Sequence, residues 1–240
     1  MSTAASAEHG SLRRLWWFAA ALFVPSIVAG LVFAMSIDSG RRAGVYAASL
    51  PEGSTTVPAA GAPRLVLAAH SVPTVDQIST AWVDRTANLT GIPATALRAY
   101  AAAQLTAPPA CHLGWTTLAG IGWIESGHGT HGGSTLQANG ETTRAISGPQ
   151  LAGGLGTALG PMQFIVSTWD RWATDGDGDG TADVNNINDA AYTAARYLCA
   201  DGHDLSRASD WAAAIFSYNH AQWYVDEVYN AANAYAKRTG

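Results

Sequence analysis

The chain has 240 residues and a formal net charge of −5, and this length suits one globular domain with an additional segment. Charged residues make up only 13% of the chain, about half of the share that is usual in soluble domains. Lys237 is the only lysine and the arginines are scattered, so the chain has no basic surface for nucleic acid, and we exclude nucleic acid as a partner.

The first predicted element is a membrane anchor near the N-terminus. Arg13 and Arg14 precede an uncharged apolar stretch, residues 15–35, that is long enough to span a bilayer. Because positive residues before a span favour the cytoplasmic side, we expect residues 1–14 in the cytoplasm and the rest of the chain outside it, at the cell membrane. A cleavable signal peptide is the alternative for the same stretch, and it would make the protein a secreted one.

The two cysteines bear on the same question of compartment. Cys111 and Cys199 are the only pair in the chain, and in an oxidising compartment we expect them to form a disulfide. Closing so long a loop would stabilise the fold by about 4 kcal/mol on the chain-entropy model. Two buried free thiols are the alternative, and a cytosolic location would favour them.

A composition change separates the anchor from the rest of the chain. Residues 36–73 are rich in Ala, Gly, Pro, Ser and Val and have no sustained helical period, which predicts a flexible, disordered linker. From residue 74 the periodicity is helical, and no later segment shows convincing strand alternation. We therefore predict a catalytic domain over residues 74–240 that is all or nearly all α-helical.

Several helices of this domain are predicted from the spacing of apolar residues and from end signals. Apolar stripes and caps predict helices after Pro93, over Trp115 to Glu125, from a Ser167 cap, from an Asn188 cap, and over two final stripes that begin at Trp211 and Val225. The glycine-rich region 132–160 has no period and is predicted to be a loop. Such a long loop in a compact domain usually has a function.

Glu125 occupies an unusual place at the end of one of these helices. Leu118, Ile121, Gly122 and Glu125 recur at the three- and four-residue spacing of one helix face, so the carboxylate lies on the side expected to be buried. A structural carboxylate that points past the stripe into water, or pairs with an arginine, is the common explanation. The alternative is a partly desolvated general acid, because desolvation favours the neutral form and raises the pKa.

Three further motifs follow Glu125 in the chain. With the segment around Glu125, "GIGWIESGHG", they are "LGPMQF", "DGDGDGTAD" and "FSYNH". In this order and at these intervals they resemble the lytic murein transglycosylases, specifically the branch related to membrane-bound lytic transglycosylase B and its actinobacterial relatives. The resemblance covers residues 91–236, and it implies a lysozyme-like all-α fold that acts on peptidoglycan glycan strands.

The resemblance also implies roles for individual residues. Glu125 would be the sole acid/base, Gln163 would line the sugar groove, and Tyr218 would support the acid. The residues implied for substrate binding are Ser126, Gly160, Met162, Gln163, Phe164, Tyr218 and Asn219. Without the resemblance, Gln163 is equally well explained as a loop-stabilising amide, and Tyr218 as a residue of an apolar stripe.

The chemistry agrees with the residue types present. Glycoside hydrolysis usually needs two carboxylates, and no obvious partner for Glu125 is found in the sequence. A lytic transglycosylase needs only one, because the 6-hydroxyl of the same N-acetylmuramic acid is the nucleophile and the Glu first gives and then accepts a proton.

The aspartate motif predicts a structural calcium site of the EF-hand kind. Alternating aspartates before Gly180 match the start of such a loop, but its twelfth position is Asn186 where the standard loop has Glu. The relatives that the motifs resemble have a longer calcium loop, which Asp189 could close. The candidate ligands are Asp175, Asp177, Asp179, Thr181 and Asp189, and a solvated acidic turn is the alternative.

Taken together, the sequence predicts a membrane-anchored lytic transglycosylase outside the cytoplasm. A lysozyme-like hydrolase on the same fold is the alternative among enzymes. A wall-binding module without turnover is the alternative among other classes, although a binding module has no need for a buried acid.

Overall fold

The computed structural model describes residues 48–63 and 75–240. The predicted cytoplasmic segment 1–14 and the anchor 15–35 lie outside these residues. Within the described part of the chain, no helix combines the length and the apolar character needed to cross a membrane.

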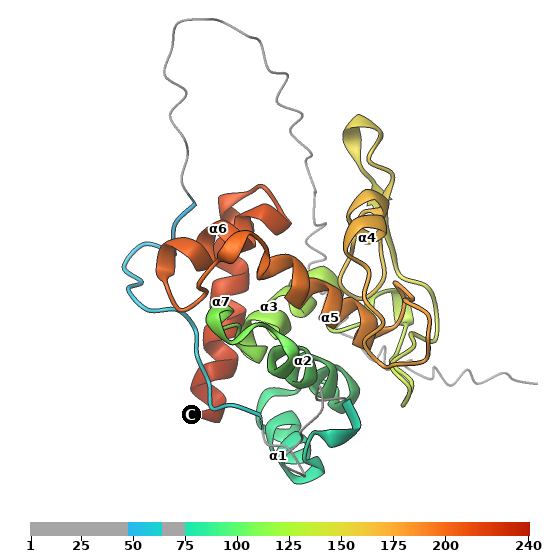
Figure 1. Ribbon diagram of the computed structural model, residues 1–240, viewed down its shortest axis with the longest axis horizontal. Helices are drawn as coiled ribbons and strands as arrows, with labels where there is room; N and C mark the ends of the chain where they lie inside the picture. Colours follow the sequence, from blue (N-terminus) through green and yellow to red (C-terminus); the bar gives the residue numbers. More distant parts are fainter. Residues whose placement is uncertain (1–47, 64–74) are drawn as a thin grey trace, which may run out of the picture.

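The described residues contain seven α-helices and one pair of short strands, besides short 3₁₀ turns and loops (Figure 1). The helices are α1 (Thr80–Thr90), α2 (Ala94–Thr106), α3 (Trp115–Ser126), α4 (Val166–Trp172), α5 (Ile187–Leu198), α6 (Ala208–Tyr218) and α7 (Gln222–Thr239). The strands are β1 (Ser147–Gln150) and β2 (Thr157–Leu159). This helix-rich architecture agrees with the predicted fold class.

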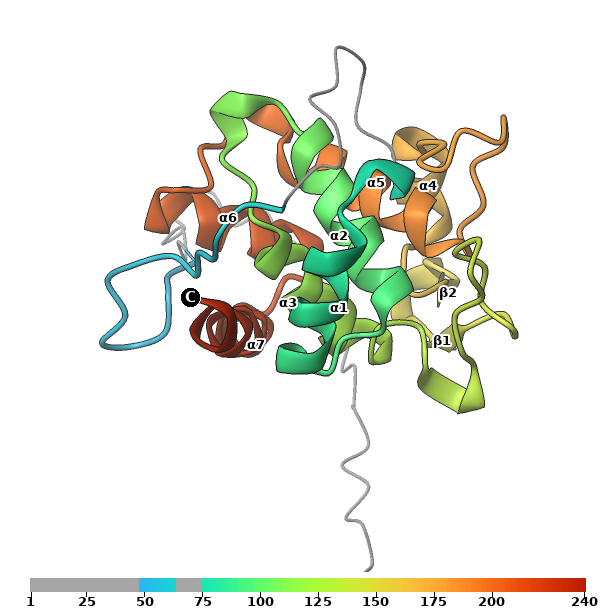
Figure 2. The same cartoon turned by 90° about the horizontal axis from the view of Figure 1, so that it is seen from below.

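Helix α3 lies at the centre of the domain. It packs between α2 and α7, while the strands and α4 lie on one side of the helical core and α7 on the other (Figures 1 and 2). Small and apolar residues allow this position, since the helix is buried on nearly all faces from Trp115 to Gly122. A Cβ at Gly120 would lie 2.8 Å from the carbonyl oxygen of Val228, so the two backbones approach as closely as glycine permits.

The predicted helix boundaries agree with the structure in some places and differ in others. Helix α2 begins directly after Pro93, and Gly127 ends α3 in a left-handed conformation, as expected. The predicted Ser167 cap is wrong, because α4 already begins at Val166, and the carbonyl of the preceding residue accepts its first amides. Asn188 is likewise not the cap of α5, because the side chain of Asn186 accepts the Asn188 amide.

The glycine-rich region 132–160 is not entirely loop. Strands β1 and β2 pair antiparallel, with Ser147 opposite Leu159 and Gln150 opposite Thr157. The register shifts between these two pairs, and each strand has only three or four residues. Strands this short cannot show a repeated alternation of apolar and polar residues, which explains why the sequence pattern predicted no strand.

Part of the predicted linker packs against the helices. Within residues 48–63, the carbonyl oxygen of Thr56 accepts a hydrogen bond from the Tyr229 hydroxyl at 3.1 Å, and that of Gly61 accepts one from the Trp115 indole at 3.3 Å. Leu50 and other apolar side chains of this segment contact the hydrophobic core. The prediction of a free linker therefore does not hold for residues 48–63, because backbone carbonyls that pair with α7 and α3 leave no periodic signal in the sequence.

The predicted disulfide is confirmed. Cys111 and Cys199 are joined with a Cα–Cα distance of 5.5 Å, within the range of ordinary disulfides. The bond connects a 3₁₀ turn after α2 to the residue that follows α5, and it closes a loop of 88 residues. It therefore constrains the two helices α2 and α5, which pack against each other.

Candidate active site

Glu125 lies in the last turn of α3, at the edge of the buried core. The helix ends one residue later, and Glu125 is half-buried. The hydroxyl of Tyr224, from the first turn of α7, donates a hydrogen bond to Glu125 Oε1 at 2.5 Å. The close packing of α3 on α7 brings these two groups together.

The surroundings of Glu125 favour its neutral form. Burial raises the pKa of Glu125 to about 7, and the hydrogen bond from Tyr224 acts in the opposite direction because it stabilises the carboxylate. A carboxyl group with this pKa exchanges its proton readily near neutral pH. The general-acid interpretation is thus favoured over a solvated or ion-paired carboxylate.

An aromatic wall continues from Tyr224 along one side of Glu125. The rings of Tyr218 and Tyr224 are nearly parallel, with an interplanar angle of 3° and centroids 6.4 Å apart, and Phe164 lies 5.7 Å from Tyr218. Burial, followed by the charge of Glu125, raises the pKa of both tyrosines, so their hydroxyls remain protonated donors. Tyr218 directs its hydroxyl to the Met162 carbonyl at 2.8 Å.

Ser126 connects the end of α3 to the turn that contains Gln163. Its hydroxyl donates to the carbonyl oxygen of Pro161 at 2.6 Å and accepts the backbone amide of Gly129 at 2.7 Å. Only 1% of Ser126 is exposed. Its place next to Glu125 therefore fixes two segments of the site and offers no surface to a substrate.

Gln163 adopts a left-handed backbone, with φ of 50°. Its side-chain amide donates to the carbonyl oxygen of Gly160 at 2.8 Å, and its side-chain oxygen lies close to Gly148 of β1. The structure thus gives Gln163 the loop-stabilising contact that was one of the two interpretations of its sequence. Left-handed non-glycine residues are uncommon and concentrate at functional sites, so the half-buried amide also stays a candidate for substrate contact.

The structure separates the predicted substrate-binding residues into two groups. Gln163, Tyr218 and Asn219 are half-buried and reach the surface, as the prediction requires. The buried group consists of Ser126, Gly160, Met162 and Phe164. These four residues offer a substrate little exposed surface in this structure, so their contact with substrate stays a prediction.

Tyr224 was missed by the sequence analysis. It donates to Glu125 although Tyr218 was the tyrosine expected to support the acid. In the sequence Tyr224 directly precedes the apolar stripe that begins at Val225, and a tyrosine there looks like any aromatic residue of a helix core. Only the crossing of α7 over α3 identifies its role.

Three of the predicted calcium ligands form a cluster. Carboxylate oxygens of Asp175, Asp177 and Asp189 lie within 4.8 Å of one another. Asp179 is not part of this cluster of carboxylates. Asp179 instead accepts the Thr181 amide at 2.8 Å, so these two predicted ligands form a local turn in this structure.

The charges of this cluster suit a cation bound by oxygen ligands. Asp189 is 1% exposed, and burial raises its pKa to about 6; the pKa of Asp177 is also raised, mainly by burial. Hydrogen bonds from backbone amides, that of Gly180 above all, lower the pKa of Asp175. Within the described residues, the ion pairs are formed by Asp204 and Asp210, so no basic side chain pairs with the three aspartates of the cluster. Crowded, partly desolvated carboxylates of this kind are the donor set that calcium prefers.

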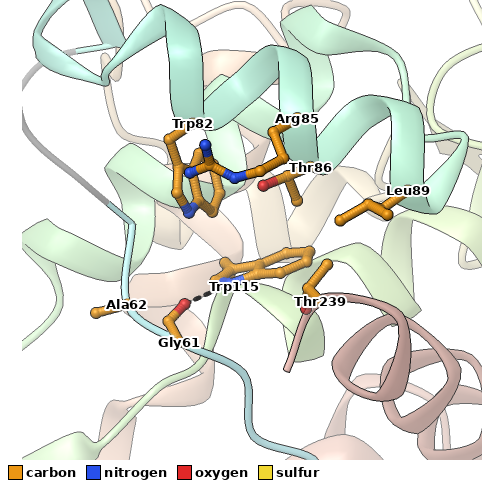
Figure 3. Close-up of a pocket in the computed structure, with 8 residues that line it drawn as sticks. All are labelled: Gly61, Ala62, Trp82, Arg85, Thr86, Leu89, Trp115 and Thr239. Atoms are coloured by element: carbon orange, nitrogen blue, oxygen red, sulfur yellow. Dashed lines mark hydrogen bonds between the residues drawn. The ribbon is translucent and has the colours of Figure 1, made fainter.

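A separate pocket of about 410 Å³ lies away from Glu125 (Figure 3). Its walls are Trp82, Arg85 and other residues of α1, the ring of Trp115 at the beginning of α3, and the end of α7. None of the predicted site residues lines this pocket. The candidate active site at Glu125 is therefore identified by the environment of its carboxyl group and not by this pocket.

The chain matches one known domain family. Residues 141–215 match the family described as "Transglycosylase SLT domain". The matched span includes the Gln163 turn and the aspartate loop, but begins after Glu125 and ends before Tyr218. This match confirms the predicted resemblance to the lytic transglycosylases, while the relation to the branch of membrane-bound lytic transglycosylase B stays a prediction. A search of curated proteins found no match.

Solved structures of lytic transglycosylases show a weak likeness. The Escherichia coli lytic transglycosylase Slt35 in complex with bulgecin A has 15% identity and a TM-score of 0.42, with 67% of this chain and 75% of that chain covered. SltB3 from Pseudomonas aeruginosa, in complex with NAG-anhNAM-pentapeptide, has 16% identity and a TM-score of 0.40, with 63% and 66% covered. Slt35 in complex with calcium has 14% identity and a TM-score of 0.31, with 65% and 70% covered. Scores below 0.5 do not by themselves establish a shared fold.

Proposed function

We propose that this chain, whose residues 141–215 match the transglycosylase SLT family, is a peptidoglycan lytic transglycosylase with Glu125 as its single acid/base. The observation that carries the proposal is the half-buried Glu125 carboxyl, with a pKa of about 7 and one hydrogen bond from the neutral Tyr224 hydroxyl. We assign a lysozyme-like fold and a relation to membrane-bound lytic transglycosylase B as part of the same proposal.

The first step is cleavage of the bond between N-acetylmuramic acid and N-acetylglucosamine. Protonated Glu125 donates its proton to the glycosidic oxygen, the bond from C1 to that oxygen breaks, and the N-acetylglucosamine end leaves as an alcohol. C1 then carries oxocarbenium-like positive charge, and Glu125 is a carboxylate. The Tyr224 hydroxyl stabilises that carboxylate through its hydrogen bond.

The second step closes a ring within the sugar. The 6-hydroxyl of the same N-acetylmuramic acid attacks C1, and its proton passes to Glu125, which returns to its protonated form. The product end is a 1,6-anhydro-N-acetylmuramic acid, and no water is consumed. Intramolecular attack has a high effective concentration, so one carboxyl group is sufficient for both steps.

The side chains near Glu125 suit sugar rings. The half-buried ring of Tyr218 offers a face on which a pyranose can stack, and Gln163 and Asn219 are half-buried amides that can hydrogen-bond to hydroxyl and acetamido groups. Phe164 supports Tyr218 from behind.

We assign calcium a structural role at Asp175, Asp177 and Asp189, with Asp179 and Thr181 as further ligands if the loop rearranges around the ion. This loop touches the active-site turn, because a Cβ at Gly160 would collide with the carbonyl of Val184. Calcium would therefore hold the Gln163 turn against α5, without taking part in the chemistry.

We further propose that the domain acts outside the cytoplasm, attached to the cell membrane by residues 15–35. The Cys111–Cys199 disulfide supports an oxidising compartment. The glycan strands of peptidoglycan would then be accessible to the domain, with the membrane as its second partner.

The product identifies the reaction. Purified peptidoglycan is incubated with the protein in calcium, and the released muropeptides are analysed by mass spectrometry. We expect ends of 1,6-anhydro-N-acetylmuramic acid, lighter by one water than the products of hydrolysis. Reducing ends would instead show a lysozyme-like hydrolase, and no release would favour a wall-binding module.

A further inference from the structure

His128 follows α3, the helix that carries Glu125, and its backbone adopts an energetically unfavourable conformation. Two amides close the end of α3, with the Gly127 amide donating to the Trp123 carbonyl at 2.9 Å and the His128 amide to the Gly122 carbonyl at 2.8 Å. His128 has φ of 61°, a left-handed conformation that favours glycine. A histidine there indicates that its side chain contributes something that glycine cannot.

The imidazole of His128 bridges two other helices. Its Nδ1 lies 3.2 Å from the hydroxyl of Tyr100 on α2, and its Nε2 lies 2.9 Å from the hydroxyl of Tyr235 on α7. The ring is 3% exposed, and burial lowers the pKa of His128 to about 4, so it is neutral in neutral solution. A neutral imidazole has one donor and one acceptor nitrogen, so in either tautomer the bridge uses both.

The two tyrosines of the bridge fix the structures that define the Glu125 site. Tyr100 is fully buried, and its hydroxyl lies where a Cβ at Gly122 would be, one turn before Glu125. Tyr235 is on α7, the same helix that presents Tyr224 to Glu125. The bridge thus joins α2 and the end of α3 to α7, about three helical turns along α7 from Tyr224.

We infer that His128 is a positioning residue, which holds the last turn of α3 against α7 so that Glu125 meets the Tyr224 hydroxyl. This inference rests on the proposed function, in which Glu125 is the acid. His128 does not act on substrate itself, because its hydrogen bonds go to Tyr100 and Tyr235. The titratable or charged groups that face it are Tyr100 from α2 and Tyr235 and Arg238 from α7, while Trp123 contacts the ring.

The test replaces His128 by Phe in the full-length chain, which keeps a ring and removes both hydrogen bonds. We expect kcat on peptidoglycan to fall about tenfold or more, with KM within about twofold, because sub-ångström misplacement of an acid affects the transition state more than binding. A weaker Tyr224 hydrogen bond stabilises the carboxylate less, so the pKa of Glu125 should rise. That pKa is measured without substrate, by titrating the ¹³C-labelled Glu carboxyl groups by NMR.

Two further variants keep the test decisive. Tyr235→Phe removes a single hydroxyl from the bridge and should shift kcat and the Glu125 pKa in the same direction by a smaller amount, even if His128→Phe folds poorly. Tyr229→Phe is the matched control, because it removes one hydroxyl from the same helix, where it donates to the Thr56 carbonyl. It should leave both quantities unchanged.

The outcomes separate this inference from the proposed function. If both bridge variants fold, and keep the wild-type kcat and Glu125 pKa while only melting earlier, the positioning role is refuted and His128 is purely structural. If the wild-type protein makes no anhydro product, the proposed function fails. In that case the NMR pKa of Glu125 still decides whether the bridge sets its environment.

Discussion

Glu125 and Asp189 are both carboxylates that the fold withdraws from water, but their neighbours differ. Glu125 has one neutral hydroxyl donor and a pKa of about 7. Asp189 accepts the amides of Gly176 and Asp183, lies beside two further aspartates, and has a pKa of about 6. Burial is the largest cause of the raised pKa at both positions.

The difference shows how surroundings direct the same chemical group to two tasks. A single neutral donor and a pKa of about 7 leave Glu125 able to gain and lose a proton near neutral pH, as an acid/base requires. At Asp189 the backbone amides fix the orientation of the carboxylate, and the adjacent aspartates add negative charge that a proton cannot fully neutralise. A divalent cation can, which agrees with the proposed structural calcium site in the aspartate loop.

The largest expected effect comes from removing the proton of Glu125. Glu125→Gln keeps the shape of the side chain but has no transferable proton, so we expect glycan cleavage to fall by about a thousandfold or more, with the thermal midpoint nearly unchanged. Product release from peptidoglycan and a thermal melt measure the two effects. Glu227→Gln, an exposed position on α7, is the matched control. Substantial remaining activity would show that another residue is the general acid.

The next largest expected effect concerns calcium binding at the aspartate cluster. Calcium at about one hundred times its Kd should stabilise the domain by about 2.7 kcal/mol, which raises the Tm by about 5–10 °C for a domain of this size. The double variant Asp175→Asn with Asp177→Asn should lose this response, and Asp201→Asn, an exposed aspartate outside the loop, should keep it. If neither calcium nor a chelator changes the Tm, the loop is a solvated acidic turn and not a calcium site.

The smallest effect tests the one donor at Glu125. Tyr224→Phe removes the hydrogen bond that stabilises the carboxylate. The neutral form then becomes more favoured, and the pKa of Glu125 should rise above 7. Because the reaction needs a protonated acid, the alkaline limb of the pH–rate profile should move to higher pH. The maximal rate should fall by about tenfold, since the developing carboxylate loses a charged hydrogen bond. An unchanged alkaline limb would show that Tyr224 does not influence the pKa of the acid.

Much of the fold was predictable from the chain alone. The helices α2, α3, α6 and α7 follow apolar stripes of the required period, and Gly127 marks the end of α3 where a left-handed residue is needed. The disulfide was predictable because the chain has only two cysteines. These features depend on residue type and local spacing, which a sequence displays directly.

Other features of the fold had no such local signal. Strands β1 and β2 are too short to alternate, and residues 48–63 pack through backbone carbonyls whose partners are far away in the chain. The cap of α5 lies two residues earlier than predicted because Asn186 and Asn188 are both good caps. Propensity cannot choose between equivalent residues, whereas the packed structure does.

By itself, the sequence identified the groups to which we assign the chemistry: Glu125 at the end of a buried helix, and an aspartate loop that follows the Gln163 turn. Only the tertiary structure decided what those groups touch. The crossing of α7 over α3 selects Tyr224 rather than Tyr218 as the donor to Glu125, and the folding of the loop against α5 brings Asp189 to Asp175. The physical reason is that hydrogen bonding and desolvation act over a few ångströms in space, between residues that are about a hundred positions apart in the chain for Glu125 and Tyr224.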